Sequence, residues 1–450
     1  MLAPDQTKPV VRPYLAAAQN LASGKETPRE FLEKSLVLLE QWEPRIGAFV
    51  CTNVPAARAA ADNSTARWRA GKPLSAIDGM PVGIKDIIET VDMPTEMGSP
   101  LFSGWRSAKD AACVRALRDA GAVILGKTVT TEFAASEPRG TRNPWNTAHT
   151  PGGSSSGSAA SVAAGIVSAA LGTQVISSTV RPASYCGCVG FKPTVNALNR
   201  QGSHDYQSQS CTGILGASLE DVWQVAHEIV ARVGGDAGTA GLQGPDKAPA
   251  ARKPQSLAVL ETAGWESAAS ASAKACLQEC VARLKSAGVE IRTRHADKKV
   301  AAIETELLKA TELSHRCNGW ENRWFLHSMR DRDASKLSRN IMERAEKYED
   351  LTLDQHRADL KERARIRAVH AELAAICDAC ITLAAPGAAP EGLNSTGNPE
   401  FGVPSSLLGV PSLSLPLFEV DVMPLGLQVI GYFDRDADAF AIASWLMQAR

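Results

Sequence analysis

Apolar positions in residues 13–71 follow a helical period. In PYLAAAQNLASG and TPREFLEKSLVLLEQWEP, hydrophobic residues recur at the spacing of three and four that places them on one face of a helix. Thr27, Pro28 and Glu30 form the pattern of a capping box with proline in the first turn. The short apolar run 46–51 predicts a strand, and we expect a further helix after it.

From residue 78 onward the pattern alternates between helices and short buried strands. The segment 78–88 is a short apolar run interrupted by a lysine, which is typical of a strand that enters a site. Residues 110–121 predict a helix that ends at a glycine, and 122–128 predict the strand after it. Residues 162–174 repeat this pattern with smaller side chains. The alternation indicates an α/β sheet.

The second half of the chain departs from this alternation in two places. Residues 231–255 are rich in glycine, proline and alanine, which predicts a surface loop or hinge. Residues 300–376 are strongly helical and charged. After them, 410–417 and 424–432 predict two buried strands joined by a hairpin-like connection. We find no repeat with the period of about 20–50 residues that a solenoid would need.

Composition limits the partners of the chain. Its 450 residues are 44% hydrophobic and 22% charged, and the formal net charge is −1. A charge so close to zero gives no electrostatic basis for binding nucleic acid or an anionic membrane, so we expect a small, roughly neutral partner. No apolar run reaches the roughly 18 residues of a membrane span. The first residues lack a signal-peptide pattern, and we expect a cytoplasmic protein.

The ten cysteines do not form a metal-binding pattern. Three pairs are close in sequence: Cys186 and Cys188, Cys276 and Cys280, and Cys377 and Cys380. A zinc site normally needs two such pairs with matching spacing, and the CxxC at 377–380 has no second pair nearby. We expect buried, reduced thiols, a reducing compartment, no metal and no cofactor.

Lys85 is the first candidate for chemistry. It stands between apolar neighbours in VGIKDII, where burial would lower the pKa of its amine. A neutral amine can act as a base near neutral pH. The alternative is that Lys85 forms a salt bridge with Asp86 at the end of a strand.

The uncharged stretch 152–165, GGSSSGSAASVAAG, allows three interpretations. Its composition fits a flexible linker, and glycines before a helix N-terminus fit a phosphate-binding loop. However, neither the GxxxxGK[ST] nor the GxGxxG spacing is present. The third interpretation is the wall of an active site, where small residues can hold an unusual backbone geometry such as a cis peptide bond.

Ser177 and Ser178 supply a candidate nucleophile. They follow a predicted strand end and precede Arg181–Pro182, which we expect to act as a sharp stop. A serine on a tight turn after a strand can attack a carbonyl, with adjacent backbone N–H groups as an oxyanion hole. A Ser-Ser pair can also be an ordinary turn. None of the eight histidines lies in a catalytic motif, so Lys85 is the available base.

Taken together, these motifs resemble the amidase signature family. The matching stretches are GMP (79–81), KD (85–86), GGSSSGS (152–158), GTQ (172–174), Ser178, RPASYCG (181–187), GFKPT (190–194), PGAAPEGLNSTGNP (386–399) and GVPSLSLP (409–416). The separation of Ser154 and Ser178 also matches the family's pattern, and the similarity covers most of residues 27–445.

The resemblance implies a fold and a catalytic mechanism. It implies an α/β fold in one domain over residues 1–450, with a central mixed twisted β-sheet covered by helices on both faces. The signature core would span about 75–225, and 300–376 would form a variable helical region over the substrate.

The family's mechanism implies roles for individual residues. Ser178 matches the nucleophile, Ser154 the bridging serine after a cis peptide bond, and Lys85 the neutral lysine that draws a proton through it. The oxyanion hole would be formed by the backbone N–H groups of Val175, Ile176, Ser177 and Ser178. An acyl-enzyme on Ser178 would then be cleared by water.

The chain departs from the family pattern at three places. Ile176 and Ser177 stand where two small residues, often glycines, usually precede the nucleophile, so their Cβ atoms could disturb a strained turn. The family's Asp-x-x-Gly is replaced by SCTG at 210–213, and a downstream arginine position is Ala217. We expect an altered pocket floor.

The sequence also gives a hypothesis for the substrate pocket. We expect a mostly apolar pocket built from parts of 130–134, 204–213, 310–330 and 396–406. The candidate substrate-binding residues are Thr131, Phe133, Gly153, Gln174, Ser210, Trp320 and Trp324. The two tryptophans either cap the cleft or pack in the core. This pocket favours a small neutral amide, anilide or carbamate, as in the family's urethane-cleaving branch, with possible ester cleavage.

Three other functions remain open at this point. The chain could be a glutamine-hydrolysing amidotransferase subunit of the same family, which would need a stable partner. It could be a catalytically silent amidase-fold binding protein, because its oxyanion turn is altered. It could also bind a nucleotide through the loop at 152. For the hydrolase we expect substrate and water as partners, neither nucleic acid nor membrane, and a monomer or homodimer.

Overall fold

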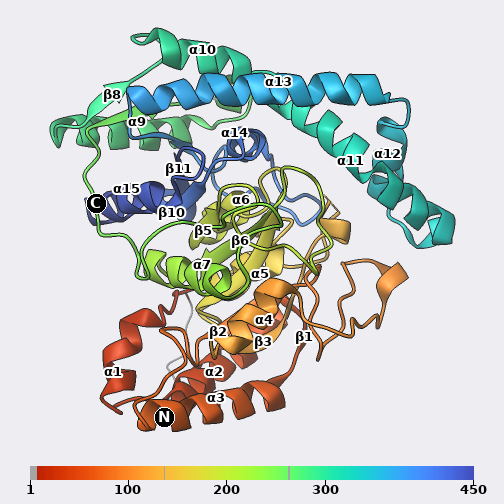
Figure 1. Ribbon diagram of the computed structural model, residues 1–450, viewed down its shortest axis with the longest axis vertical. Coiled ribbons are helices and arrows are strands. Elements are labelled where there is room, and N and C mark those ends of the chain that lie inside the picture. Colours follow the sequence, from red (N-terminus) through yellow and green to blue (C-terminus); the bar gives the residue numbers. More distant parts are fainter. Residues whose placement is uncertain (1–7, 136, 262–263, 450) are drawn as a thin grey trace.

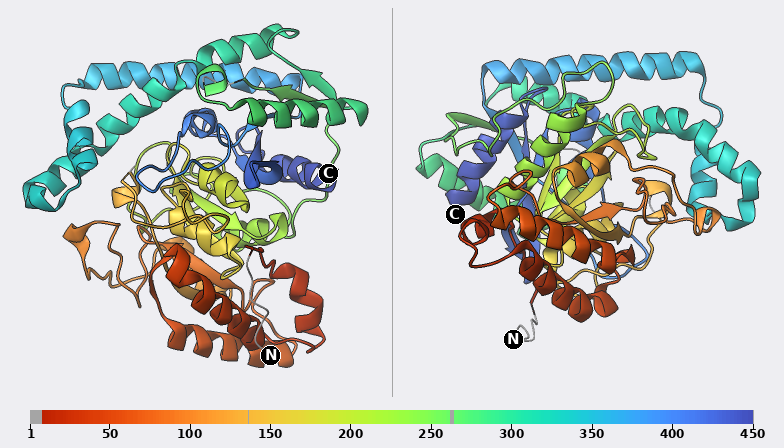
Figure 2. Two further views of the ribbon diagram at one scale, coloured as in Figure 1. Left: turned by 180° about the vertical axis from the view of Figure 1, so that it is seen from behind. Right: turned by 60° about the horizontal axis from the view of Figure 1, so that its bottom comes forward.

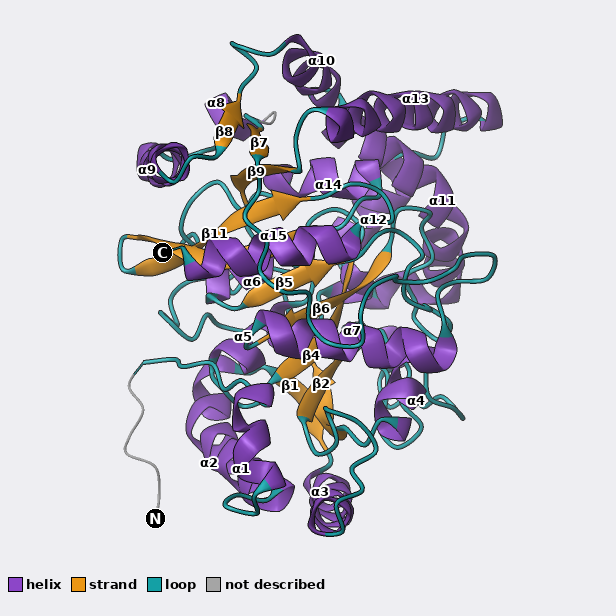
Figure 3. Cartoon of the chain, turned by 60° about the vertical axis from the view of Figure 1, so that its left-hand side comes forward, coloured by secondary structure: helices purple, strands orange, loops and turns teal. Residues whose placement is uncertain are grey.

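A computed structural model describes residues 8–135, 137–261 and 264–449. In this part of the chain, one 11-stranded sheet runs through the middle of the molecule, in the order β1-β3-β2-β4-β6-β5-β10-β11-β9-β7-β8 (Figures 1 and 3). The strands are β1 (Phe49–Thr52), β2 (Pro81–Lys85), β3 (Val123–Thr128), β4 (Ala169–Gln174), β5 (Val189–Lys192), β6 (Cys211–Gly216), β7 (Ser256–Val259), β8 (Glu290–Arg292), β9 (Ala379–Leu383), β10 (Ser412–Val420) and β11 (Met423–Ile430).

The sheet is mixed. β2 is parallel to β3 and β4, and β7 is parallel to β8 and β9, whereas the central strands from β6 to β11 pair antiparallel. The α-helices are α1 (Ala18–Ala22), α2 (Pro28–Ile46), α3 (Val54–Arg69), α4 (Ala112–Asp119), α5 (Ser156–Ala163), α6 (Val180–Cys186), α7 (Leu219–Val233), α8 (Gly264–Ser267), α9 (Ala271–Ser286), α10 (Lys298–Leu307), α11 (Ala310–Asp333), α12 (Arg339–Lys347), α13 (Leu353–Ala371), α14 (Val403–Leu408) and α15 (Asp436–Gln448).

Helices cover both faces of the sheet because its strands are apolar on both sides. In β3, Val123 and Leu125 belong to the core shared with α2, α3, α5 and α6. The intervening Ile124 belongs to the core shared with α4, α7, α9 and α15. This alternation follows from the two-residue repeat of a strand. The fold class predicted from the sequence, an α/β fold with a mixed sheet between helices, is confirmed.

A third core lies at one end of the molecule. There α10, α11, α13 and α14 pack against β7, β9 and β11 through residues such as Leu313 and Ile366. Figures 1 and 2 show α10–α13 together at this end, with α11 and α12 extending past the sheet. The charged helical region predicted at 300–376 is confirmed, and its apolar stripe explains why it packs here.

Most of the other predicted elements are also present. The capping box at α2 is complete, since the Thr27 side chain accepts from the N–H of Glu30 and the Glu30 carboxylate accepts from that of Thr27. β10 and β11 form the expected antiparallel hairpin. Residues 234–255 carry neither helix nor strand, as predicted for the loop that follows α7.

One local prediction is wrong. Arg181–Pro182 does not stop a structural element but lies in the first turn of α6. The missing N–H of proline is tolerated there, because a first turn has no preceding carbonyls to bind. One consequence is that Pro182 cannot donate to the carbonyl of Ser178. That oxygen instead accepts from the N–H of Ser155 at 3.3 Å.

The cysteines are unpaired, and most of them are buried. Only Cys51 and Cys276 have intermediate exposure among them. Between residues 8 and 449, outside the gaps at 136 and 262–263, the structure brings no three His, Cys, Asp or Glu side chains together to hold a metal ion. In the same ranges, no helix has both the length and the apolar character needed to cross a membrane.

Candidate active site

Two parallel strands bring the candidate catalytic residues to one edge of the sheet. Lys85 is the last residue of β2, and Gln174 is the last residue of its parallel neighbour β4. The register pairs Ile84 with Leu171, so both strands end at the same edge. The turn that carries Ser178 follows β4 directly, which places it beside the lysine.

Lys85 is fully buried and bonds to two hydroxyl groups. Its Nζ lies 2.7 Å from Ser154 Oγ and 2.8 Å from Thr173 Oγ1. Burial lowers the pKa of Lys85 to about 7, and the charge of Asp205 opposes this shift. The salt bridge with Asp86 that the sequence allowed is absent, because Asp86 pairs with Lys127 at 3.0 Å. Lys85 therefore has a neutral form available near pH 7.

The stretch 152–165 is neither a linker nor a phosphate loop. All of its residues are buried, and the peptide bond between Gly153 and Ser154 is cis. Backbone N–H groups near the start of α5 are already occupied, since Ser155 donates to Ser178 and Gly157 to Val129. A phosphate would need such donors to be free. The interpretation as an inner wall beside Lys85 agrees with the structure.

The turn at 175–178 presents backbone donors to a cavity. All four residues line the cavity, and within the described ranges no hydrogen bond uses their N–H groups. None of the four belongs to the described residues with positive φ. Ile176 and Ser177 therefore fit this turn without glycine, which answers the concern raised by their Cβ atoms.

A hydrogen-bond network that the sequence did not reveal holds this turn. Gln174 Oε1 accepts from the N–H groups of Thr179 and Val180, and its Nε2 donates to Ser406 Oγ at 3.0 Å. Ser406 Oγ in turn donates to the carbonyl of Ile176 at 2.8 Å. Gln174, predicted to bind substrate, is instead buried in the scaffold of the turn.

We expect Ser406→Ala to lower kcat about 10- to 100-fold with a smaller change in KM, because the turn loses a support rather than a substrate contact. Steady-state kinetics on any cleaved substrate would measure this split. Ser405→Ala is the matched control, since Ser405 Oγ donates only to Gly402 within the same helical segment. An equal loss in both variants would contradict the role of Ser406.

Arg181 links the wall at 153 to the opposite loop. Its guanidinium donates to the carbonyls of Gly153 and Gly397, each at 2.7 Å, and to Thr396 Oγ1 at 3.0 Å. A side chain at Gly153 would collide with Thr396, so the two loops are in close contact. Gly153, a predicted substrate contact, acts in this clamp.

The cavity in front of the turn has a volume of about 380 Å³. It is lined by parts of all four predicted segments, with Phe133, Gln207, Asn318 and Thr396 as examples. The expectation of a mostly apolar lining is wrong, however. A further helix, α12, contributes Arg344 and Lys347, among other residues outside the predicted ranges.

Few of the predicted substrate-binding residues reach this cavity. Phe133 lines it, whereas Thr131 and Ser210 are buried behind its wall. The two tryptophans do not cap it. Trp320 stacks on His356 at 5.3 Å between ring centroids, and Trp324 is 78% exposed. The helix turns both indoles away and directs Gly319 and Asn322 to the cavity instead.

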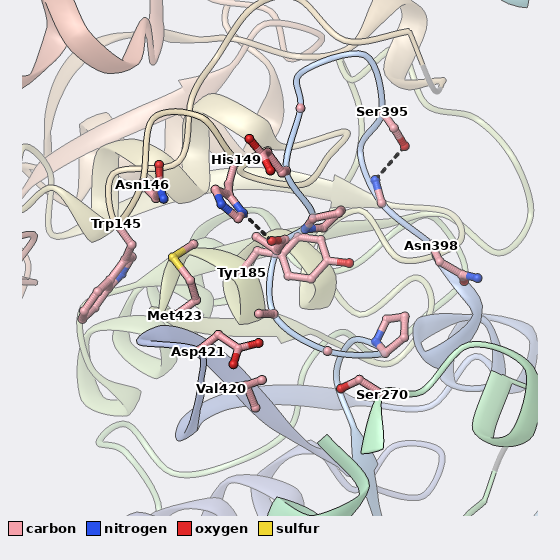
Figure 4. Close-up of a pocket in the computed structure, with 18 of the residues that line it drawn as sticks. Trp145, Asn146, His149, Tyr185, Ser270, Ser395, Asn398, Val420, Asp421 and Met423 are labelled. Carbon is pink, nitrogen blue, oxygen red and sulfur yellow. Dashed lines mark hydrogen bonds between the residues drawn. The ribbon is translucent and has the colours of Figure 1, made fainter. Parts of the chain in front are cut away.

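A second, larger cavity of about 800 Å³ lies behind the segment 394–398. Figure 4 shows His149, Tyr185, Ser395 and Met423 around it, and His149 Nδ1 lies 2.7 Å from the carbonyl oxygen of Ala389. Ser395 and Gly397 line both cavities. None of the candidate catalytic residues lines this second one.

Comparison with known proteins agrees with this geometry. Residues 30–439 match the family described as Amidase. The chain belongs to the amidase family. An enzyme of this family hydrolyses the C–N bond of an amide, and the buried lysine, the cis peptide bond and the serine turn lie within the matched region. The amidase is therefore a carbon–nitrogen bond hydrolase.

Individual relatives extend the comparison. The amidase is 40% identical over 238 residues to a glutamyl-tRNA(Gln) amidotransferase subunit of Chloroflexus aggregans, a match over 51% of this chain and 49% of that one. It is 30% identical to the protein of the same name from Oleidesulfovibrio alaskensis, over 96% of each. The first of these matches thus spans only about half of the relative's length. A solved structure described as an amidase superposes with a TM-score of 0.82 at 26% identity, covering 97% of this chain and 99% of that one.

Proposed function

We propose that the amidase cleaves small amides, anilides or carbamates through an acyl-enzyme on Ser178. Ser178 Oγ attacks the carbonyl carbon, and its proton passes to Ser154 Oγ while the proton of Ser154 passes to Lys85 Nζ. The observation that supports this relay is the 2.7 Å contact between Lys85 Nζ and Ser154 Oγ in a fully buried site. A lysine with a pKa of about 7 can both accept and return a proton near neutral pH.

The turn would stabilise the charge that develops on the carbonyl oxygen. The N–H groups of residues 175–178 face the cavity without other acceptors in the described residues, and such preorganised donors favour an oxyanion. The leaving amine takes the proton back through Ser154. Water then attacks the acyl-enzyme by the same relay and releases the acid together with the free hydroxyl of Ser178.

A carbamate fits the same chemistry, because attack on its carbonyl resembles attack on an amide. Cleavage of an activated ester would also use the same steps, with an alcohol as leaving group. These activities share one nucleophile, so a panel of an anilide, a dicarbamate and an ester should lose all three activities together when Ser178 is changed.

A second candidate function is supported by the relatives. The Chloroflexus and Oleidesulfovibrio proteins are named as amidotransferase subunits, so glutamine hydrolysis for a partner enzyme is the alternative. A silent binding protein is the other, although the undistorted turn at 175–178 gives it no support.

One experiment separates these functions. The purified chain is treated with a fluorophosphonate probe and assayed with a p-nitroanilide panel, a dicarbamate, an ester and glutamine. We expect labelling of Ser178 and turnover of amides or carbamates. Turnover of glutamine alone would favour the amidotransferase function, and absence of both labelling and turnover would favour the silent protein.

A further inference from the structure

The substrate cavity carries an excess of positive charge. Arg181, Arg344 and Lys347 line it, and Asp205 is the one aspartate or glutamate among its described lining residues. None of the three cations forms an ion pair with a described carboxylate, and Asp205 forms none either. Arg181 is committed to the clamp between the loops at 153 and 396. The free positive charge therefore belongs to α12.

Arg344 and Lys347 lie one turn apart on the face of α12 that meets α11 (Figure 2). Burial lowers the pKa of the Arg344 guanidinium, although its side chain is open to the cavity. After burial, the charges of Arg344 and Lys347 are the next causes that lower the pKa of His315 across the cavity. A desolvated cation without an acidic partner is costly to keep, which indicates that a ligand supplies the anion.

Polar groups around Arg344 also lack partners. In the described residues, the side-chain amide of Asn318 and the hydroxyl of Tyr348 are buried and form no hydrogen bond. Both residues line the same cavity. Buried polar atoms normally have partners, so these groups are available to a ligand. The position of Tyr348 depends on Gly319, where any side chain would collide with the tyrosine ring.

We propose that Arg344, supported by Lys347, Asn318 and Tyr348, binds a carboxylate of the substrate. This inference rests on the proposed function and defines its substrate class: small amides or carbamates that carry a carboxylate away from the scissile bond. The fork of a guanidinium matches a carboxylate through two parallel hydrogen bonds. A cavity of about 380 Å³ holds a molecule of this size, with Phe133 and Leu326 beside its apolar part. The neutral substrate expected from the sequence is thereby replaced by an anionic one.

The test compares charged and neutral substrates of equal length. The mono-p-nitroanilides of malonic, succinic and glutaric acid are assayed beside their methyl esters, with the intact chain and with Arg344→Gln. We expect the intact chain to prefer at least one acid over its ester. For that acid, Arg344→Gln should raise KM about 10- to 100-fold, while its effect on the ester stays within about threefold.

Arg339→Gln is the matched control on the same helix. Arg339 pairs with Glu343 and its side chain is 91% exposed, so both substrates should be cleaved as by the intact chain. The inference is overturned if the intact chain shows no preference for any acid, or if Arg344→Gln weakens acid and ester equally. In either case cleavage of the ester that depends on Ser178 would leave the proposed function standing.

A binding measurement covers the reverse situation. In Ser178→Ala, glutarate or succinate should raise the melting temperature, and adding Arg344→Gln should remove that shift while Arg339→Gln preserves it. If this pattern is found but the intact chain cleaves no substrate, the carboxylate site stands and the proposed function fails. If neither dicarboxylate stabilises Ser178→Ala, the carboxylate site is rejected.

Discussion

Ser178→Ala is expected to lower kcat/KM by about 10⁴- to 10⁶-fold, the range seen when a serine hydrolase loses its nucleophile. The physical reason is that no acyl-enzyme can form, while the backbone donors of the turn remain. The residual rate would come from these donors and from substrate binding. Initial rates with the best substrate of the panel, over a wide range of enzyme concentration, would measure the loss.

Ser177→Ala is the natural control, because it makes the same chemical change one residue earlier. Ser177 Oγ is buried without a hydrogen-bond partner in the described residues, and the variant keeps its backbone N–H. We expect a loss below about tenfold. Comparable losses at 177 and 178 would mean that the turn had been disturbed, and they would remove the case for Ser178 as nucleophile.

Lys85→Met should lower kcat/KM at pH 7 by at least about 10³-fold, since the relay loses its base while the length and packing of the side chain are kept. Lys192→Met provides a comparison. Lys192 is also fully buried with a lowered pKa, but it donates to the carbonyl of Pro193 and does not line the substrate cavity. It should lose stability without a comparable loss of turnover. Near-normal turnover of Lys85→Met would refute the relay.

The same lysine sets the expected pH dependence. Its pKa is lowered to about 7, so the amine is neutral above that pH and protonated below it. Only the neutral form can accept the proton of Ser154. We therefore expect kcat/KM to fall about tenfold per pH unit on the acidic side of the profile. A profile that stays flat from pH 8 to pH 5 would show that another group is the base.

The sheet edge that carries the site could be predicted from the sequence for a clear reason. Short apolar runs that end in Lys85 and Gln174 identified two buried strands, and the serine turn followed directly in the chain. The contacts that support this turn could not be predicted, because Ser406 reaches Ile176 from 230 residues away. Pro182 was misjudged because proline marks both a stop and a helix's first turn.

The polar side of the cavity was missed for a different reason. Asn340, Arg344 and Lys347 have the spacing of one helix face, which the sequence does show. A charged face normally points to water, however, and only the packing of α12 against α11 turns it toward a cavity. The tryptophans failed for the converse reason, since large aromatic residues in a helix drew attention away from Gly319.

The support of the turn by α14 has a consequence for how this enzyme becomes active. Ser406 must reach the turn, and β5 gains its partner only when β10 arrives from the far end of the chain. Such distant pairings close late, because they pay the largest loss of chain entropy. The nucleophile and its base should therefore be aligned only in the last stage of folding, so that a partly synthesised chain exposes no working hydrolase.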